Sequence, residues 1–226
     1  MPPPIMTSDT HPVTGQIKSK DRVRDLAEVF TNEREVKAML DLIPLKQADD
    51  IISFRYLEPA CGNGNFLIAI LRRKLDRVNK KYAHKNLRTY EFYIARALTT
   101  IYGIDICPEN VMESKARLFT EIKSTFDMNK GSFVYTSGFF NLIDHILSTN
   151  IVVGDSINKP DEVVLTQYKV AGRNFSQANF RLSDLSSKNP EPISTTESKH
   201  FLRIGTEHNN STGIHHEGKQ RHLDFV

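Results

Sequence analysis

The stretch Tyr56-Leu57-Glu58-Pro59-Ala60-Cys61-Gly62-Asn63-Gly64-Asn65-Phe66-Leu67 carries the strongest structural signal in this chain of 226 residues. The segment 53–57 predicts a short β-strand that ends at Glu58-Pro59. Apolar residues with helical spacing begin at Leu67, so a helix is expected directly after the two glycines. A strand, a glycine turn and a helix in this order are typical of an open α/β sheet, where ligands bind at the carboxyl ends of the strands.

Strands and helices alternate on both sides of this stretch. Further helices are predicted at 33–43, 88–98, from Pro108 onward and at 140–147, and further strands at 100–105 and 150–155. This alternation indicates βαβ units and a parallel, doubly wound sheet. The next two predicted strands, 162–170 and 174–182, are separated by three residues and indicate an antiparallel hairpin. We therefore expect an α/β fold with an incomplete parallel sheet and a C-terminal β-hairpin.

The chain divides into three parts by composition. Residues 1–19 contain four prolines and polar filler, which predicts a flexible leader. Residues 20–186 hold the alternating elements and predict one domain. Residues 187–226 are polar with few apolar anchors, so a tail is expected that stays loose unless a partner orders it.

The overall composition excludes several classes of protein. The net charge is only +3, and no apolar run approaches the ~20 residues of a membrane-spanning helix. The first residues, Met-Pro-Pro-Pro-Ile-Met, lack the basic start and apolar stretch of a signal peptide. Two cysteines 46 residues apart fit neither a disulfide scaffold nor a zinc site and favour a reducing cytoplasm. The histidines have no regular ligand spacing, so no metal site is predicted.

Positive charge is concentrated in one segment. Residues 151–226 contain 9 Lys+Arg and 9 Asp+Glu, whereas residues 72–88 contain eight basic residues and one acid, Asp76. Such a segment could follow a phosphate backbone, and Arg72, Arg73 and Lys74 are its predicted DNA contacts. The alternative interpretation is a solvated helix face and the loop after it.

Residues 58–67 read Glu-Pro-Ala-Cys-Gly-Asn-Gly-Asn-Phe-Leu. They lack the third glycine of the dinucleotide-binding fingerprint and the Gly-Lys-Ser/Thr of a phosphate loop, which disfavours a dehydrogenase or an NTPase. The sequence instead resembles the adenine-N6 DNA methyltransferases, whose glycine loop commonly reads Glu/Asp-Pro-Ala/Ser-Cys-Gly-x-Gly-x-Phe-Leu. Three shorter segments, 28–31, 103–106 and 154–156, are similar to further motifs of that family and occur in the same order. The resemblance covers residues 20–156 and implies a Rossmann-like domain that binds S-adenosylmethionine, within a restriction-modification system.

The resemblance implies a role for each matched residue. Glu58 would lie near the positively charged methionine end of the cofactor, Asp105 would accept hydrogen bonds from the ribose hydroxyls, and Asp155 would accept one from the adenine amino group. The full set of expected cofactor-binding residues is Phe30, Thr31, Glu58, Ala60, Gly62, Asn63, Gly64, Asp105, Ile106, Asp155 and Ser156.

One motif of the resembled family is missing. Its members carry an Asn/Asp-Pro-Pro-Tyr/Phe loop that binds the target amine and stacks on the flipped base. The prolines after Asp155 are Pro160, Pro190 and Pro192, and none belongs to a Pro-Pro-aromatic sequence, so no catalytic residue is assigned. One interpretation is an adenine-specific DNA methyltransferase, or its cofactor-binding subunit, completed by a second polypeptide that brings the catalytic loop and target recognition. Others are a non-catalytic regulatory protein of a restriction or phage-defence system that binds S-adenosylmethionine, and an enzyme that methylates RNA or protein.

Overall fold

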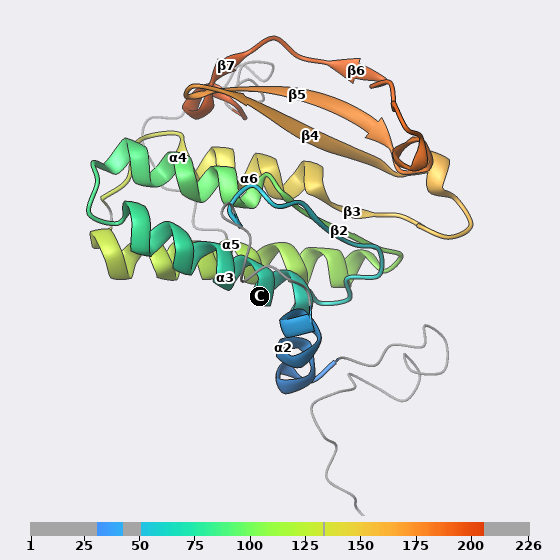
Figure 1. Cartoon of the computed structure of the whole chain (residues 1–226), viewed down its shortest axis with the longest axis horizontal. Helices are drawn as coiled ribbons and strands as arrows, with labels where there is room; N and C mark the ends of the chain where they lie inside the picture. Colours follow the sequence, from blue (N-terminus) through green and yellow to red (C-terminus); the bar gives the residue numbers. More distant parts are fainter. Residues whose placement is uncertain (1–30, 43–50, 133, 206–226) are drawn as a thin grey trace, which may run out of the picture.

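The structure, a computed structural model, describes residues 31–42, 51–132 and 134–205 (Figure 1). The helices are α2 (Glu33–Leu42), α3 (Asn65–Tyr82), α4 (Leu87–Leu98), α5 (Pro108–Lys130) and α6 (Phe139–Asn150). The strands are β1 (Tyr56–Glu58), β2 (Ile101–Asp105), β3 (Ile151–Val153), β4 (Val164–Ala171), β5 (Asn174–Arg181), β6 (Ser194–Thr195) and β7 (Lys199–His200). The short 3-10 helices are η2 (Pro160–Glu162), η3 (Ser183–Ser186) and η4 (Phe201–Arg203). The predicted leader, 1–19, lies outside the described residues.

The fold is mixed α/β, with one parallel and one antiparallel sheet. Strands β1, β2 and β3 form the parallel sheet in the order β1-β2-β3, with Glu58 opposite Gly103 and Asp105 opposite Val153. This register brings the carboxyl ends of the three strands to the same edge. The predicted parallel sheet and C-terminal hairpin are both present.

The antiparallel sheet is built on the hairpin of β4 and β5, which pair along eight residues each. Strands β6 and β7 both pair with β5, although the sequence predicts a loose tail from residue 187. That prediction is wrong for residues 187–205, because Phe201 (0% exposed) and Ile204 (4%) anchor this segment in the main core.

The two faces of the parallel sheet are covered differently. On one face, Gly103 lies against Leu67 of α3 and Cys61 of the glycine loop. On the other face, Tyr102 and Ile104 of β2 belong to a separate apolar cluster with residues of the antiparallel sheet. Figure 1 shows the hairpin lying over α4 and α6, with α3 and α5 below them.

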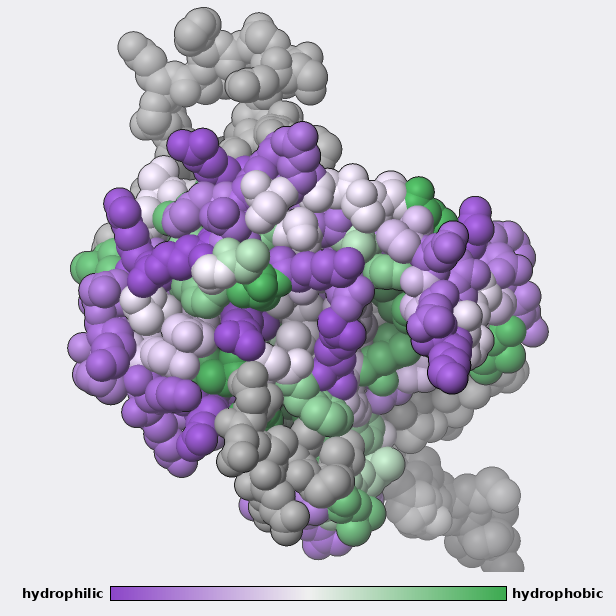
Figure 2. Space-filling view, turned by 45° about the horizontal axis from the view of Figure 1, so that its top comes forward, coloured by the Kyte–Doolittle hydropathy of each residue, from purple (hydrophilic) through white to green (hydrophobic). Residues whose placement is uncertain are grey.

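The molecular surface in the view of Figure 2 is largely hydrophilic, and its hydrophobic residues lie in small separate areas. Within the described residues, no helix combines the length and the apolar character needed to cross a membrane.

A buried lysine fixes the chain just before β1. Lys74 of α3 is 1% exposed, and its ammonium donates to the carbonyl oxygens of Ile51 (3.0 Å), Ile52 (3.2 Å) and Phe54 and to Thr100 Oγ1 (2.7 Å). Because three carbonyl groups turn toward this ammonium, residues 51–55 form turns and coil, and β1 begins at Tyr56. The sequence predicts a strand from residue 53, which is three residues too early.

A buried carboxyl group makes stability depend on pH. Glu91 of α4 is 0% exposed, accepts a hydrogen bond from the Thr136 N–H, and has one oxygen without a hydrogen-bond partner among the described residues. Burial raises the pKa of Glu91 above its ordinary value of 4.5. Folding therefore favours the protonated form, and this stabilisation is complete below the ordinary pKa and is lost as the pH rises through the folded-state pKa.

We expect Glu91→Gln to be more stable than the wild type at pH 8 and close to it at pH 4, because the amide keeps the acceptor and never ionises. Urea unfolding across this pH range measures the difference. Glu191→Gln, at an exposed position, is the control and should leave the pH profile unchanged. If Glu91→Gln and the wild type showed the same dependence of stability on pH, the raised pKa of Glu91 would be contradicted.

Candidate functional site

The glycine loop folds over the carboxyl end of β2. The Cys61 N–H donates to the Ile104 carbonyl at 2.8 Å, and the Gly62 N–H donates to Asp105 Oδ2 at 2.8 Å. The segment after β1 and the acid at the end of β2 are thus joined by a hydrogen bond across 43 positions of sequence. The structure brings these two predicted site residues together.

Both loop glycines are required by their backbone conformation. Gly62 has φ 52° and Gly64 has φ 89°, a region that side-chain-bearing residues rarely adopt. A Cβ on Gly64 would also lie 2.5 Å from Ser114 Oγ of α5. The Gly64 carbonyl accepts the Ile68 N–H at 2.9 Å, so the loop passes directly into α3 and presents the start of that helix to the same edge.

The Asp105 carboxylate has most of its acceptor capacity engaged. Oδ2 accepts from Gly62, while Oδ1 accepts from the Cys107 N–H at 2.9 Å and more weakly from Asn110 Nδ2 at 3.4 Å. A carboxylate offers about four lone-pair positions, so one remains for a ligand hydroxyl. Asp105 therefore holds the loop in place and keeps a smaller capacity for an external donor.

Ile106 follows Asp105 at the sheet edge and is 61% exposed. A large apolar side chain exposed beside a carboxylate provides a surface against which a flat apolar ring can pack. Its position agrees with the predicted role, which stays a prediction.

The end of β3 reaches the glycine loop through Ser156, whose hydroxyl donates to the Pro59 carbonyl at 2.8 Å. Asp155 instead closes its own turn. Its Oδ1 accepts the N–H groups of Ile157 (3.0 Å) and Asn158 (2.8 Å), and its Oδ2 accepts Asn158 Nδ2 (2.8 Å). These hydrogen bonds to Asn158 and Ile157 lower the pKa of Asp155, so the group is ionised and acts as an acceptor. In this structure both carboxylate oxygens of Asp155 accept hydrogen bonds from residues of its own turn.

Glu58, at the end of β1, is half-buried. The Tyr56 hydroxyl donates to its Oε2 at 3.3 Å, and the Ala60 N–H is also bonded to this carboxyl. Burial is the larger influence and raises the pKa of Glu58, while burial and the neighbouring carboxylate raise the pKa of Tyr56 to about 12. A carboxylate with incomplete solvation favours a positively charged ligand nearby.

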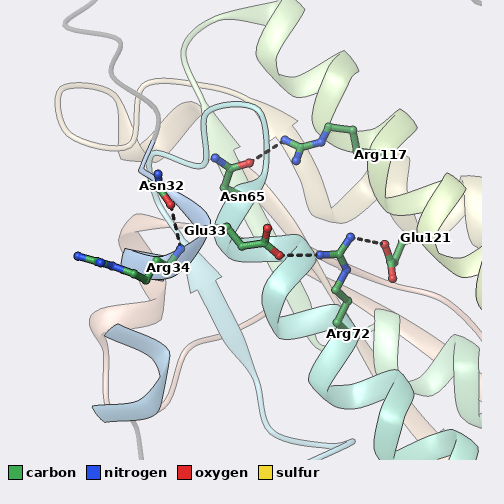
Figure 3. A network of polar contacts seen from close by, with 7 residues as sticks. All are labelled: Asn32, Glu33, Arg34, Asn65, Arg72, Arg117 and Glu121. Atoms are coloured by element: carbon green, nitrogen blue, oxygen red, sulfur yellow. Dashed lines mark hydrogen bonds and ion pairs between the residues drawn. The ribbon is translucent and has the colours of Figure 1, made fainter. Parts of the chain in front are cut away.

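A polar network ties α2 to the glycine loop (Figure 3). Asn65 Nδ2 donates to the Thr31 carbonyl at 3.0 Å, while Arg117 of α5 donates to Asn65 Oδ1 (2.9 Å) and to the Asn63 carbonyl (2.6 Å). Asn63 also donates to Glu113 of α5 at 3.1 Å. Of the predicted cofactor-binding residues, Thr31 is therefore bonded to Asn65, and Asn63 lies in the loop and is bonded to α5. Phe30 lies outside the described residues. Arg117 carries no motif in the sequence, and only the folded chain identifies it.

The cavities formed by the described residues include one between helices and one beside β1. The first, of about 170 Å³, lies between α2, α3 and α5, and its lining includes Glu33, Arg72 and Arg117. Its arginines already have partners, because Arg72 pairs with Glu33 (3.2 Å) and Glu121 (3.0 Å), as Figure 3 shows. The second, of about 370 Å³, lies beside β1. Neither cavity is lined by Asp105 or Asp155, so these acids lie on the sheet edge outside both of them.

The three predicted DNA contacts all bond to other parts of the protein, although only Lys74 is buried and Arg72 remains exposed. Lys74 is 1% exposed and donates to oxygen atoms of residues 51–54 and Thr100, so its prediction as a DNA contact is wrong. Arg73 donates to Asp41 (2.8 Å) and to the Leu40 carbonyl (3.0 Å), and Arg72 bridges two glutamates. These three residues of α3 join α2, α5 and the segment before β1.

Comparisons of the chain with models of known protein families, with curated proteins and with solved structures gave no match.

Proposed function

We propose that this chain is the S-adenosylmethionine-binding part of an adenine-specific DNA methyltransferase of a restriction-modification system, built on a Rossmann-like domain. The observation that supports it best is the hydrogen bond from the Gly62 N–H to Asp105, because it joins two of the motif-bearing segments at the carboxyl edge of a parallel sheet. The bond from Ser156 to Pro59 adds the third segment to the same edge.

The residues at this edge fit the proposed cofactor. Asp105 keeps one acceptor position for a ribose hydroxyl, Ile106 offers an exposed apolar face to the adenine ring, and Glu58 offers a carboxylate to the positively charged methionine end. When bound, S-adenosylmethionine supplies an electrophilic methyl group. The chain's own contribution is to bind and orient the cofactor, and Asp155 contributes to adenine binding only when its turn releases an acceptor.

A second polypeptide completes the enzyme in this proposal. Methyl transfer to an adenine amine requires the base to be flipped out of the DNA duplex and held by acceptors and a stacking ring. The missing Pro-Pro-aromatic motif assigns that role to the partner. With Lys74 buried, DNA contact by this chain would involve the exposed cations of α3, which are Arg72, Arg77, Lys80 and Lys81.

A non-catalytic regulatory protein that binds S-adenosylmethionine is the second candidate. The missing Pro-Pro-aromatic sequence favours it, because a protein that only binds the cofactor needs no catalytic loop. An adjacent reading frame that encodes an Asn-Pro-Pro-Tyr or related loop would favour the two-part enzyme, and its absence would favour the regulatory protein.

Replacing Asp105 tests the cofactor site. We expect Asp105→Ala to weaken S-adenosylmethionine binding at least tenfold in isothermal titration, a loss of about 1.4 kcal/mol or more, because it removes the ribose acceptor and frees the glycine loop. Asp76→Ala, an exposed acid on α3, is the matched control and should bind as the wild type does. Thermal unfolding of each variant separates lost binding from lost folding. No binding by the wild type at millimolar cofactor, or equal binding by Asp105→Ala, would refute the proposal.

A further inference from the structure

Strand β1 is one of the two edge strands of the parallel sheet that the structure describes, and β3 is the other. In the order β1-β2-β3, β1 pairs only with β2 among the strands that the structure describes. The Tyr56 N–H bonds to the Thr100 carbonyl at 2.9 Å on the β2 side. Because successive residues of a strand alternate, the N–H and carbonyl of Leu57 point the other way, to the open edge.

An apolar groove runs beside this edge. We define the β1 edge groove as the cavity of about 370 Å³ lined by Arg55, Leu57, Tyr102, Leu165, Phe180 and Leu185, with further contributions from their neighbours. Leu57 and Leu185 are 37% and 42% exposed, so apolar surface remains open to solvent on two sides of the groove. An unpaired strand edge beside an apolar groove has the two features that bind an extended peptide: main-chain hydrogen bonds and pockets for alternate side chains.

The charge of the groove indicates which side chains a bound segment would carry. Arg55 is the one charged residue among the groove-lining residues, and no acid lines the groove. Gln167 accepts from the Arg55 guanidinium when its amide oxygen faces it, which leaves the positive charge uncompensated. An acidic side chain on the occupant would complement it.

The edge is recessed, which argues against pairing with a second copy. Residues of β4, β5 and the segment after η3 form the wall opposite β1. Two recessed edges cannot approach each other, whereas a single extended segment can enter. The three residues of β1 offer few hydrogen bonds, so apolar contacts in the groove must supply most of the affinity.

We propose that the β1 edge groove binds an extended segment of a second polypeptide, which pairs with β1, places alternate apolar side chains in the groove and sets an acidic side chain against Arg55. This inference names the docking place of the partner in the proposed function. It does not depend on cofactor binding, so its test can fail or succeed separately.

The test is a selection of random nine-residue linear peptides against the full chain without cofactor. We expect the enriched peptides to alternate apolar residues with an acidic one. Arg55→Glu should change the selected charge from acidic to basic. Leu57→Asp and Leu185→Asp, both at exposed positions, should each weaken a selected peptide at least tenfold, whereas Met128→Asp, at a residue of α5 that is 78% exposed, should leave its affinity unchanged.

Hydrogen exchange supplies the strand-specific readout, because a paired segment should slow exchange of the Leu57 amide. The proposal is overturned if no peptide is enriched, if the selected peptides bind Leu57→Asp as they bind the wild type, or if the Leu57 amide gains no protection. It is also overturned if the groove-directed variants abolish a dimer of this chain, or if cross-linking shows that another segment of the same chain fills the groove.

Discussion

Lys74→Met will lower the free energy of unfolding by about 3 kcal/mol or more, because three carbonyl groups lose their donor together. The methionine keeps the aliphatic stem but leaves the carbonyl groups of Ile51, Ile52 and Phe54 without their ammonium donor. Each buried carbonyl left without a partner costs about 1–3 kcal/mol when water cannot reach it. Urea unfolding followed by circular dichroism measures the change.

Lys80→Met is the matched control, since Lys80 lies on the same helix and is exposed. Its free energy of unfolding should stay within about 0.5 kcal/mol of the wild type. If the two substitutions cost the same, Lys74 does not anchor the segment before β1. This comparison also separates structure from DNA binding, because both variants remove one positive charge from the basic segment.

Gly64→Ala will lower the free energy of unfolding by about 2–5 kcal/mol. The left-handed backbone at φ 89° costs a side-chain-bearing residue about 1–2 kcal/mol, and the new Cβ would lie 2.5 Å from Ser114 Oγ, an overpacking that costs about 1–3 kcal/mol more. Thermal or urea unfolding measures the sum.

Gly172→Ala isolates the backbone part of this effect. Gly172 also has a positive φ, of 62°, but no atom lies within 4 Å of its would-be Cβ, so only the conformational cost of about 1–2 kcal/mol is expected. The double variant Gly64→Ala/Ser114→Ala should recover part of the steric cost, because it removes the closest atom. Equal destabilisation by the two glycine substitutions would show that the loop does not press against α5.

The regular elements could be predicted because their signals are local. The apolar spacing of α3 and α5, the strand pattern of β2 and the short connection between β4 and β5 all depend on neighbouring residues. That residues 187–205 adopt a defined structure could not be predicted in this way. Phe201 and Ile204 are two apolar residues in a polar segment, and only their burial against a distant core orders residues 187–205.

Lys74 shows why the burial of a single basic residue cannot be predicted from the sequence. In the sequence it stands among eight basic residues and is indistinguishable from its solvated neighbours. Its partners lie at 51–54 and at Thr100, so the reason for its burial exists only in three dimensions. The ion pairs of Arg72 with Glu33 and Glu121 are long-range in the same way.

Only part of the candidate site could be predicted from the sequence. The placement of the glycines and Asp105 at one edge of the sheet could be predicted, because a tight turn after a strand and an acid at the next strand end are visible in the sequence. The role of Asp155 could not, since a carboxylate that closes its own turn and one that binds a ligand have the same sequence pattern. Arg117, which joins the Asn63 carbonyl to Asn65, stands alone on a long helix and gives no signal at all.

Amide hydrogen exchange of the full chain with and without S-adenosylmethionine tests the central claim most directly. If the cofactor binds at the carboxyl edge of the parallel sheet, exchange slows at residues 60–65, 105–108 and 154–158 and stays unchanged at the hairpin turn 171–174. Protection confined to other segments, or no change at millimolar cofactor, would contradict the account.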